Sequence, residues 1–165
     1  MEIRKNNWYK FATFNGILLE VQEYSGLGWC YRTKDCSYAE SNGFFTIEDS
    51  DYYLLPIKDI AHTRGFYSYV GCKYKGYKCF VHSYGKNEKK FCVAIPEDLA
   101  LTMGIDGYRW GHETPSMDVP LSDLDEIYRR REKLKDFIFD VDPIKPIYKD
   151  GKWLIEPDEN GVYVI

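Results

Sequence analysis

The stretch from Phe66 to Ile95 constrains the fold most, because it is rich in aromatic and apolar residues on both sides of Lys75-Gly76. A glycine in a two-residue loop supplies the positive φ that a hairpin turn requires, and the turn then fixes the strand register. The predicted cross-strand pairs are Tyr74 with Tyr77, Cys72 with Cys79, Val70 with Val81 and Ser68 with Ser83 on one face, and Lys73 with Lys78, Gly71 with Phe80, Tyr69 with His82 and Tyr67 with Tyr84 on the other.

A third strand is expected to follow the loop formed by residues 85–88. If that loop has four residues, Tyr84 pairs with Lys89, and Phe91 and Val93 lie beside His82 and Phe80. The second face of the sheet then becomes broadly apolar. Because a sheet that is apolar on both faces must be covered twice, we expect a helix to pack on this face.

The rest of the chain predicts further hairpins and two helices. Asn15-Gly16 and Asp150-Gly151 are preferred pairs for type I′ hairpin turns. Proline and acids at the start of 96–103 predict a short helix there. Other predicted elements are strands over Trp29–Thr33, Phe44–Glu48 and Tyr52–Ile60, and loops over Ser37–Gly43 and Ile105–Val119. Together these elements predict a single α+β domain over residues 1–165, in which a mainly antiparallel sheet carries two packed helices.

The second predicted helix covers residues 122–134. Leu124, Ile127, Tyr128 and Leu134 are spaced as one face of a helix. Ser122 with an acid three residues later is close to a capping box, which marks a helix start. We therefore expect this helix to cover the sheet.

Composition limits the classes of function. A formal net charge of -4 argues against sequence-independent binding of nucleic acid and favours a basic protein partner. The five cysteines contain no CxxC pair, which favours reduced thiols over a disulfide framework or a zinc ribbon. The chain has neither an apolar signal segment at its start nor a membrane-spanning stretch, so we expect a soluble, cytoplasmic protein without membrane contact.

The residues suited to catalysis form few convincing sets. Cys79 and His82 are three apart, which on a strand places them on opposite faces, so we predict no metal site and no cofactor. The best enzyme hypothesis pairs Tyr69 with His82 as an acid–base couple acting on nucleic acid. In that hypothesis the phosphate contacts come from nearby lysines: Lys73, Lys78 and Lys90. Cross-strand aromatic packing explains the same Tyr69 and His82 pair without chemistry.

A second hypothesis is a protein-binding surface, made of acidic residues with aromatic residues among them. Aromatic anchors flanked by acids are typical of an interface with a basic protein. Acids are also common in solvated turns and at helix starts, which would explain them without a partner. The predicted partner-binding residues are Glu48, Asp49, Asp51, Trp110, Asp118, Asp123 and Glu126.

The segment Asp118–Tyr128, DVPLSDLDEIY, resembles some small bacterial immunity proteins that neutralise polymorphic or contact-dependent toxins. The resemblance extends over the second half of the chain, from the aromatic strands through residue 134. It implies a binding protein that occludes the active site or another surface of a toxin domain. The leading hypothesis is therefore that the chain is not an enzyme but an inhibitor, which acts by binding a toxin.

Overall fold

The computed structural model describes residues 9–48, 50–85, 89–105 and 114–156, and the chain separates into two compact units. Unit 1 is built from residues 69–130 and from the chain after 141, and unit 2 from residues 9–68 and 131–141. Mainly antiparallel strands and two short α-helices make up the described residues, so the predicted α+β class is confirmed. That the whole chain folds as one domain stays a prediction.

Unit 2 is a sheet in the order β6-β1-β2-β3-β5-β4, to which β6 contributes its first residues. The Asn15-Gly16 turn is confirmed, since φ is 49° at Asn15 and 80° at Gly16, and Phe14 faces Ile17 across it. The elements are β1 (Tyr9–Phe14), β2 (Ile17–Tyr24), β3 (Gly28–Thr33), α1 (Cys36–Asn42), β4 (Phe45–Thr46), β5 (Tyr53–Pro56) and the 3-10 turn η1 (Ile60–His62).

The helix α1 lies where a loop over Ser37–Gly43 was predicted, so that prediction is wrong. Asp35 caps the helix, accepting a hydrogen bond from the Tyr38 backbone N–H at 3.0 Å. Gly43 ends it in the left-handed conformation, at φ 74°. The buried Ala39 ties α1 to the core of unit 2, which also contains Ala12, Val21, Tyr31, Phe44, Ile57, Leu134 and Phe137.

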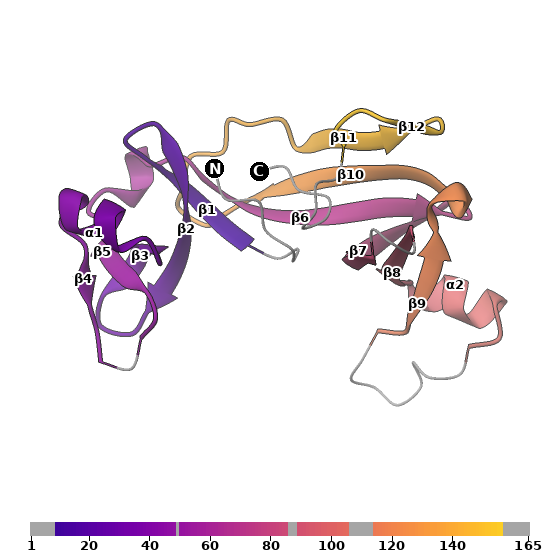
Figure 1. Ribbon diagram of the computed structural model, residues 1–165, viewed down its shortest axis with the longest axis horizontal. Coiled ribbons are helices and arrows are strands. Elements are labelled where there is room, and N and C mark those ends of the chain that lie inside the picture. The colour runs from indigo at the N-terminus through magenta and orange to yellow at the C-terminus, as the bar shows by residue number, and fades with distance from the viewer. Residues whose placement is uncertain (1–8, 49, 86–88, 106–113, 157–165) are drawn as a thin grey trace. The chain divides into compact units, whose positions relative to one another are not determined.

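Unit 1 is a sheet in the order β12-β11-β10-β6-β7-β8-β9, in which β10 and β6 are neighbours (Figure 1). The predicted helix near 96–103 is confirmed as α2, and the end of the predicted 105–119 loop forms β9. The elements are β6 (Gly65–Tyr74), β7 (Tyr77–Gly85), β8 (Lys90–Ala94), α2 (Glu97–Thr102), β9 (Ser116–Pro120), the 3-10 turn η3 (Leu121–Asp123), β10 (Leu124–Lys133), β11 (Ile144–Lys149) and β12 (Lys152–Trp153).

The β6–β7 hairpin has the predicted register only near its turn. Tyr74 faces Tyr77, and the pairing continues to Gly71 opposite Phe80. Beyond that point β6 changes partner, because Ser68 pairs with Tyr9 of β1. The predicted pairing of Ser68 with Ser83 is therefore wrong, since one edge of β6 cannot bind both strands at the same residue.

The predicted β7–β8 register is also wrong. Tyr84 pairs with Phe91 and Val81 with Val93, with a bulge at His82 between them. A bulge adds one residue to one strand, so the side chains beyond it change face. Phe91 and Val93 consequently join Val81 in the core instead of lying beside Phe80.

The predicted helix over 122–134 is wrong, because this segment forms the turn η3 and the strand β10. β10 pairs with β11, and its register shifts between Ile127 and Tyr128. The bulge buries these two consecutive residues, which breaks the strand period of two and imitates helical spacing. Residues 122–134 therefore do not provide the helix that was predicted to cover the second face of the β6–β7 hairpin.

The core of unit 1 gathers side chains from its strands and from α2. Leu99 and Ala100 attach α2, while Ile127 of β10 and Ile147 of β11 are fully buried. The remaining members are Val70, Cys72, Tyr74, Cys79, Val81, Phe91, Val93, Ile95, Val119, Leu124 and Tyr148.

Candidate functional site

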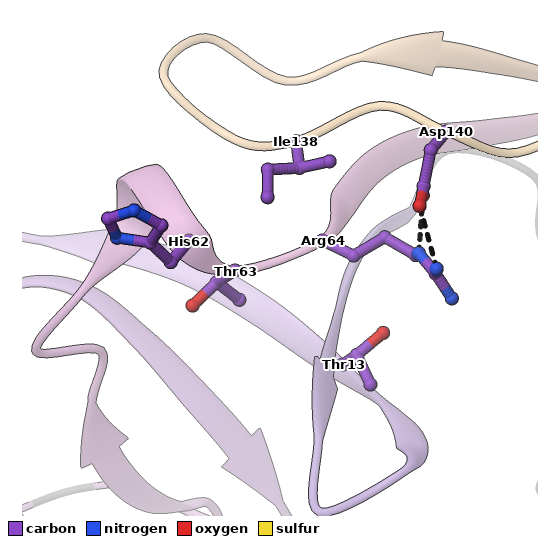
Figure 2. Close-up of a pocket in the computed structure, with 6 residues that line it drawn as sticks. All are labelled: Thr13, His62, Thr63, Arg64, Ile138 and Asp140. Carbon is purple, nitrogen blue, oxygen red and sulfur yellow. Dashed lines mark hydrogen bonds and ion pairs between the residues drawn. The ribbon is translucent and has the colours of Figure 1, made fainter.

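A pocket of about 330 Å³ lies within unit 2, lined by Thr13, His62, Thr63, Arg64, Ile138 and Asp140 (Figure 2). Backbone hydrogen bonds hold its walls together. The Gly65 N–H donates to the Ile138 carbonyl at 3.0 Å, and the Ile138 N–H donates to the Thr63 carbonyl at 3.0 Å. On the other side the Thr13 N–H donates to the Arg64 carbonyl at 2.9 Å. The pocket therefore forms where β1, the start of β6 and the segment after β10 meet.

Arg64 and Asp140 form the charged end of this pocket. The Arg64 guanidinium donates through Nε and Nη2 to the two carboxylate oxygens of Asp140, with Nη2 2.7 Å from Oδ2. These hydrogen bonds lower the pKa of Asp140 and raise the pKa of Arg64. About half of each side chain is exposed, so this is a surface pair that fixes the guanidinium in one orientation.

No residue that lines this pocket, His62 included, was predicted from the sequence to be a site residue. Nδ1 of His62 lies 2.9 Å from Oδ2 of Asp59, which also accepts a hydrogen bond from the His62 backbone N–H and so caps η1. The sequence signal that could have pointed to His62 is Asp59, an acid three residues before it. The imidazole is 82% exposed and points away from Arg64 in Figure 2. The lining side chains thus do not converge on one reacting atom.

A second hollow of about 230 Å³ adjoins the first, since both are lined by Thr13 and Arg64. Arg131 lines it, and its guanidinium lies 5.6 Å from the centre of the Phe66 ring. Two arginines beside an apolar wall can hold a polar ligand, but neither pocket pairs a nucleophile with a base.

The described β6–β7 ladder ends at Gly71 opposite Phe80, before the predicted pair of Tyr69 and His82. Tyr69 is 6% exposed, and its ring centre lies 5.2 Å from that of Phe80. His82 is exposed at the bulge of β7, beyond the point where β6 leaves β7. The predicted direct pairing is wrong because β6 has already begun to pair with β1.

The lysines of the same hypothesis lie on strands of unit 1. Lys73 and Lys78 are exposed and face each other across the β6–β7 hairpin. Lys90 is exposed on β8, opposite Pro120 of β9.

The predicted partner-binding acids of unit 1 lie on three successive elements. Asp118 is exposed on β9, opposite Cys92, and Asp123 accepts a hydrogen bond from the Ser122 hydroxyl at 3.0 Å. Glu126 on β10 faces Lys149 of β11 and is half-buried. These acids therefore have neighbours within the unit, and Asp118 and Asp123 remain accessible.

The remaining predicted acids belong to unit 2. Glu48 is exposed, and the Asp51 side chain is 87% exposed with its Oδ2 3.6 Å from Nζ of Lys34. Asp49 and Trp110, also predicted to bind a partner, lie outside the described residues. The described acids thus form two groups, one in each unit.

An exposed aromatic residue accompanies the acids of unit 2. Phe45 is 39% exposed on β4, the last strand in the order of this unit, where β4 pairs with β5. The preceding residue, Phe44, points into the core and packs edge-on against Phe14 and Tyr38. Phe45 therefore stands on a rigid base. We call Phe45, Glu48 and Asp51 the β4 surface.

Comparisons of the chain with protein-family models, with curated proteins and with solved structures found no match. Within the described ranges, no group of three or more His, Cys, Asp or Glu side chains is placed to hold a metal ion. The helices that the structure describes are too short or too polar to cross a membrane.

Proposed function

We propose that this chain is a cytoplasmic bacterial immunity protein, an inhibitor that neutralises a cognate toxin domain by binding it directly. The observation that carries the proposal is the β4 surface, where exposed Phe45 is followed along the chain by the exposed carboxylates of Glu48 and Asp51. Large aromatic residues are the usual anchors of protein interfaces, and acids around them steer a basic partner.

Phe45 has the properties of an anchor. A side chain on a fixed backbone loses less conformational entropy on binding, and the buried Phe44 next to Phe45 holds the backbone in place. Phe45 also lies on a two-residue strand at the end of the sheet order, where a partner meets little obstruction from described strands. A pocket on a toxin domain could therefore accept this ring.

The two acids are available to a cationic partner. The ion pair of Asp51 with Lys34 is an exposed contact at 3.6 Å, and such surface pairs contribute little to stability. Lysine or arginine of a partner can therefore displace Lys34. The net charge of -4 adds long-range attraction to a basic toxin domain.

The alternative function, a small nucleic-acid-directed enzyme or binder, rested on Tyr69 beside His82. The described β6–β7 ladder ends before these residues meet, and the overall charge has the wrong sign for phosphate. Substituting His82→Ala and assaying RNA cleavage is the experiment for that function. Cleavage by the native chain that the substitution abolishes would support it over the immunity proposal.

Co-expression with the toxin domain encoded next to this gene tests the proposal. We expect the chain to protect cells from that toxin and to purify with it as a complex. Phe45→Ala should weaken the complex at least about tenfold, as expected for an interface anchor. Glu48→Lys should slow association, with an effect that falls as salt is added.

Leu101→Ala and Glu97→Lys provide the matched controls. They change an exposed apolar residue and an exposed acid of the helix α2, which belongs to unit 1 and is not part of the β4 surface. We expect both to bind as the native chain does. If no complex forms and cells are not protected, the proposed function is wrong; if the controls weaken binding as much as Phe45→Ala, the β4 surface is not the interface.

A further inference from the structure

Two thiols face each other inside the β6–β7 hairpin. Cys72 lies directly opposite Cys79, two pairs from the turn at Lys75-Gly76. Both are free, and they are buried at 0% and 3% exposure in the core of unit 1. The turn fixes this register, since φ is 50° at Lys75 and 81° at Gly76, as a type I′ turn requires.

The spacing of the two residues suits a disulfide. Residues directly opposite in an antiparallel pair have Cα atoms about 4.5–5.5 Å apart, and disulfides join Cα atoms about 4.4–6.8 Å apart. The register therefore places the two residues within the Cα range of a disulfide. The other cysteines are less well placed: Cys30 and Cys36 belong to unit 2, and Cys92 on β8 faces Ser83 and Asp118.

The environment gives the two thiols different reactivity. The interaction between the two thiols lowers the pKa of Cys79, whose S–H donates to the Tyr77 carbonyl at 3.7 Å. The same interaction, together with burial, raises the pKa of Cys72. Cys79 is thus the better nucleophile, because the thiolate is the reactive form, and Cys72 keeps the proton.

We propose that Cys72 and Cys79 are a redox-active pair that forms a reversible cross-strand disulfide when the chain meets a peroxide. The Cys79 sulfur attacks one oxygen of hydrogen peroxide, forming the S–O bond of a sulfenic acid while the O–O bond breaks and one water leaves. The Cys72 sulfur then attacks the Cys79 sulfur, forming the S–S bond, and the hydroxyl leaves with the Cys72 proton as a second water.

The balance of this reaction is complete. Two thiols lose two electrons and two protons, and the peroxide is reduced to two waters. A dithiol reductant reverses it by thiol–disulfide exchange. Because the sulfurs of Cys72 and Cys79 are both buried, we expect peroxide to oxidise this pair slowly. Alkylation of the exposed Cys36 should be faster than this oxidation.

Peptide mapping of the full chain tests the proposal without any substitution. Lys73, Lys75 and Lys78 lie between the two cysteines, so trypsin separates Cys72 from Cys79 unless a disulfide joins the fragments. After peroxide treatment of the folded chain, we expect the joined fragments with the loss of two hydrogen atoms. Dithiothreitol should release them, and the oxidised chain should melt at a higher temperature because a closed loop restrains the unfolded state.

Single substitutions assign the roles. In Cys72→Ser, Cys79 should stop at the sulfenic acid and be trapped by dimedone, whereas Cys79→Ser should give neither trapping nor the linked fragments. Cys36→Ser, at an exposed position, is the control and should oxidise as the native chain does. Linkage of Cys72 or Cys79 to another cysteine, or two thiols that stay reduced while the chain is folded, would overturn the proposal.

Discussion

The backbone of Gly71 on β6 lies against the phenol ring of Tyr128 on β10. A methyl group at Gly71 would fall 2.6 Å from Cε2 and 2.9 Å from the hydroxyl oxygen of that ring. Neither group can move freely, because Gly71 is paired with Phe80 and Tyr128 is buried. We expect Gly71→Ala to lower the free energy of unfolding by about 1–3 kcal/mol, the usual cost of overpacking, as measured by urea denaturation.

The double substitution with Tyr128→Ala supplies the control. Without the ring, alanine at residue 71 should cost nothing or stabilise by about 0.5–1 kcal/mol, because glycine is unfavourable inside a strand. A full cost that persists in the Tyr128→Ala background would place the strain somewhere other than this contact.

The turns of this fold could be predicted from the sequence, whereas the strand β10 could not. The turns at Asn15-Gly16, Lys75-Gly76 and Asp150-Gly151 were predicted correctly, because their chemistry is local: each adopts the positive φ pair that such residues favour. The strand β10 was not, because a bulge at Ile127 gave it the apparent spacing of a helix. Charge pairs at helical spacing, such as Asp125 with Arg129, would stabilise a helix by only about 0.2–0.5 kcal/mol each, less than a strand gains from its neighbours.

The candidate site was harder to predict than the fold. Glu48 and Asp51 were selected from charge alone, and nothing in the sequence separated Phe45, which is exposed, from Phe44, which is buried. The β6–β7 register stops before Tyr69 and His82 for a long-range reason, since β6 exchanges β7 for β1. No local pattern reports such an exchange.

The cap of α1 offers a prediction about the helix that the sequence analysis missed. Asp35 accepts a hydrogen bond from the Tyr38 N–H, and α1 has only seven residues to offset the loss of this bond. Asp35→Ala should therefore destabilise the chain by about 1 kcal/mol, whereas Asp35→Asn should cost much less because asparagine is also a good cap. Thermal denaturation followed by circular dichroism checks both, and equal effects of the two variants would mean that the cap does not stabilise α1.

The Arg64 and Asp140 pair predicts a pH dependence of stability. Hydrogen bonds from Arg64 lower the pKa of Asp140 in the folded chain. The stabilisation is therefore fully present above the unfolded pKa of about 3.9, and it is lost as pH falls through the lower folded value. We expect Asp140→Asn to melt below the native chain at neutral pH, with the difference disappearing in strong acid and shrinking in high salt.

Asp125→Asn, which removes an exposed carboxylate of β10, controls for the loss of one negative charge. It should not reproduce the acid-dependent difference seen with Asp140→Asn. A difference in melting temperature between native chain and Asp140→Asn that stays constant from neutral to strongly acidic pH would contradict the assignment.

Lys73 and Lys78 face each other directly across the β6–β7 hairpin with both side chains exposed. Like charges in this position repel, whereas opposite charges contribute roughly 0.2–1 kcal/mol. Lys78→Glu should therefore raise the free energy of unfolding by up to about 1 kcal/mol at low salt, and Lys78→Gln, which only removes the repulsion, should give part of that gain. Both gains should fall in about 1 M salt, where the Debye length is about 3 Å. Urea denaturation at low and high salt measures this, and a gain for Lys78→Glu that is independent of salt would show that strand propensity, and not charge, is its source.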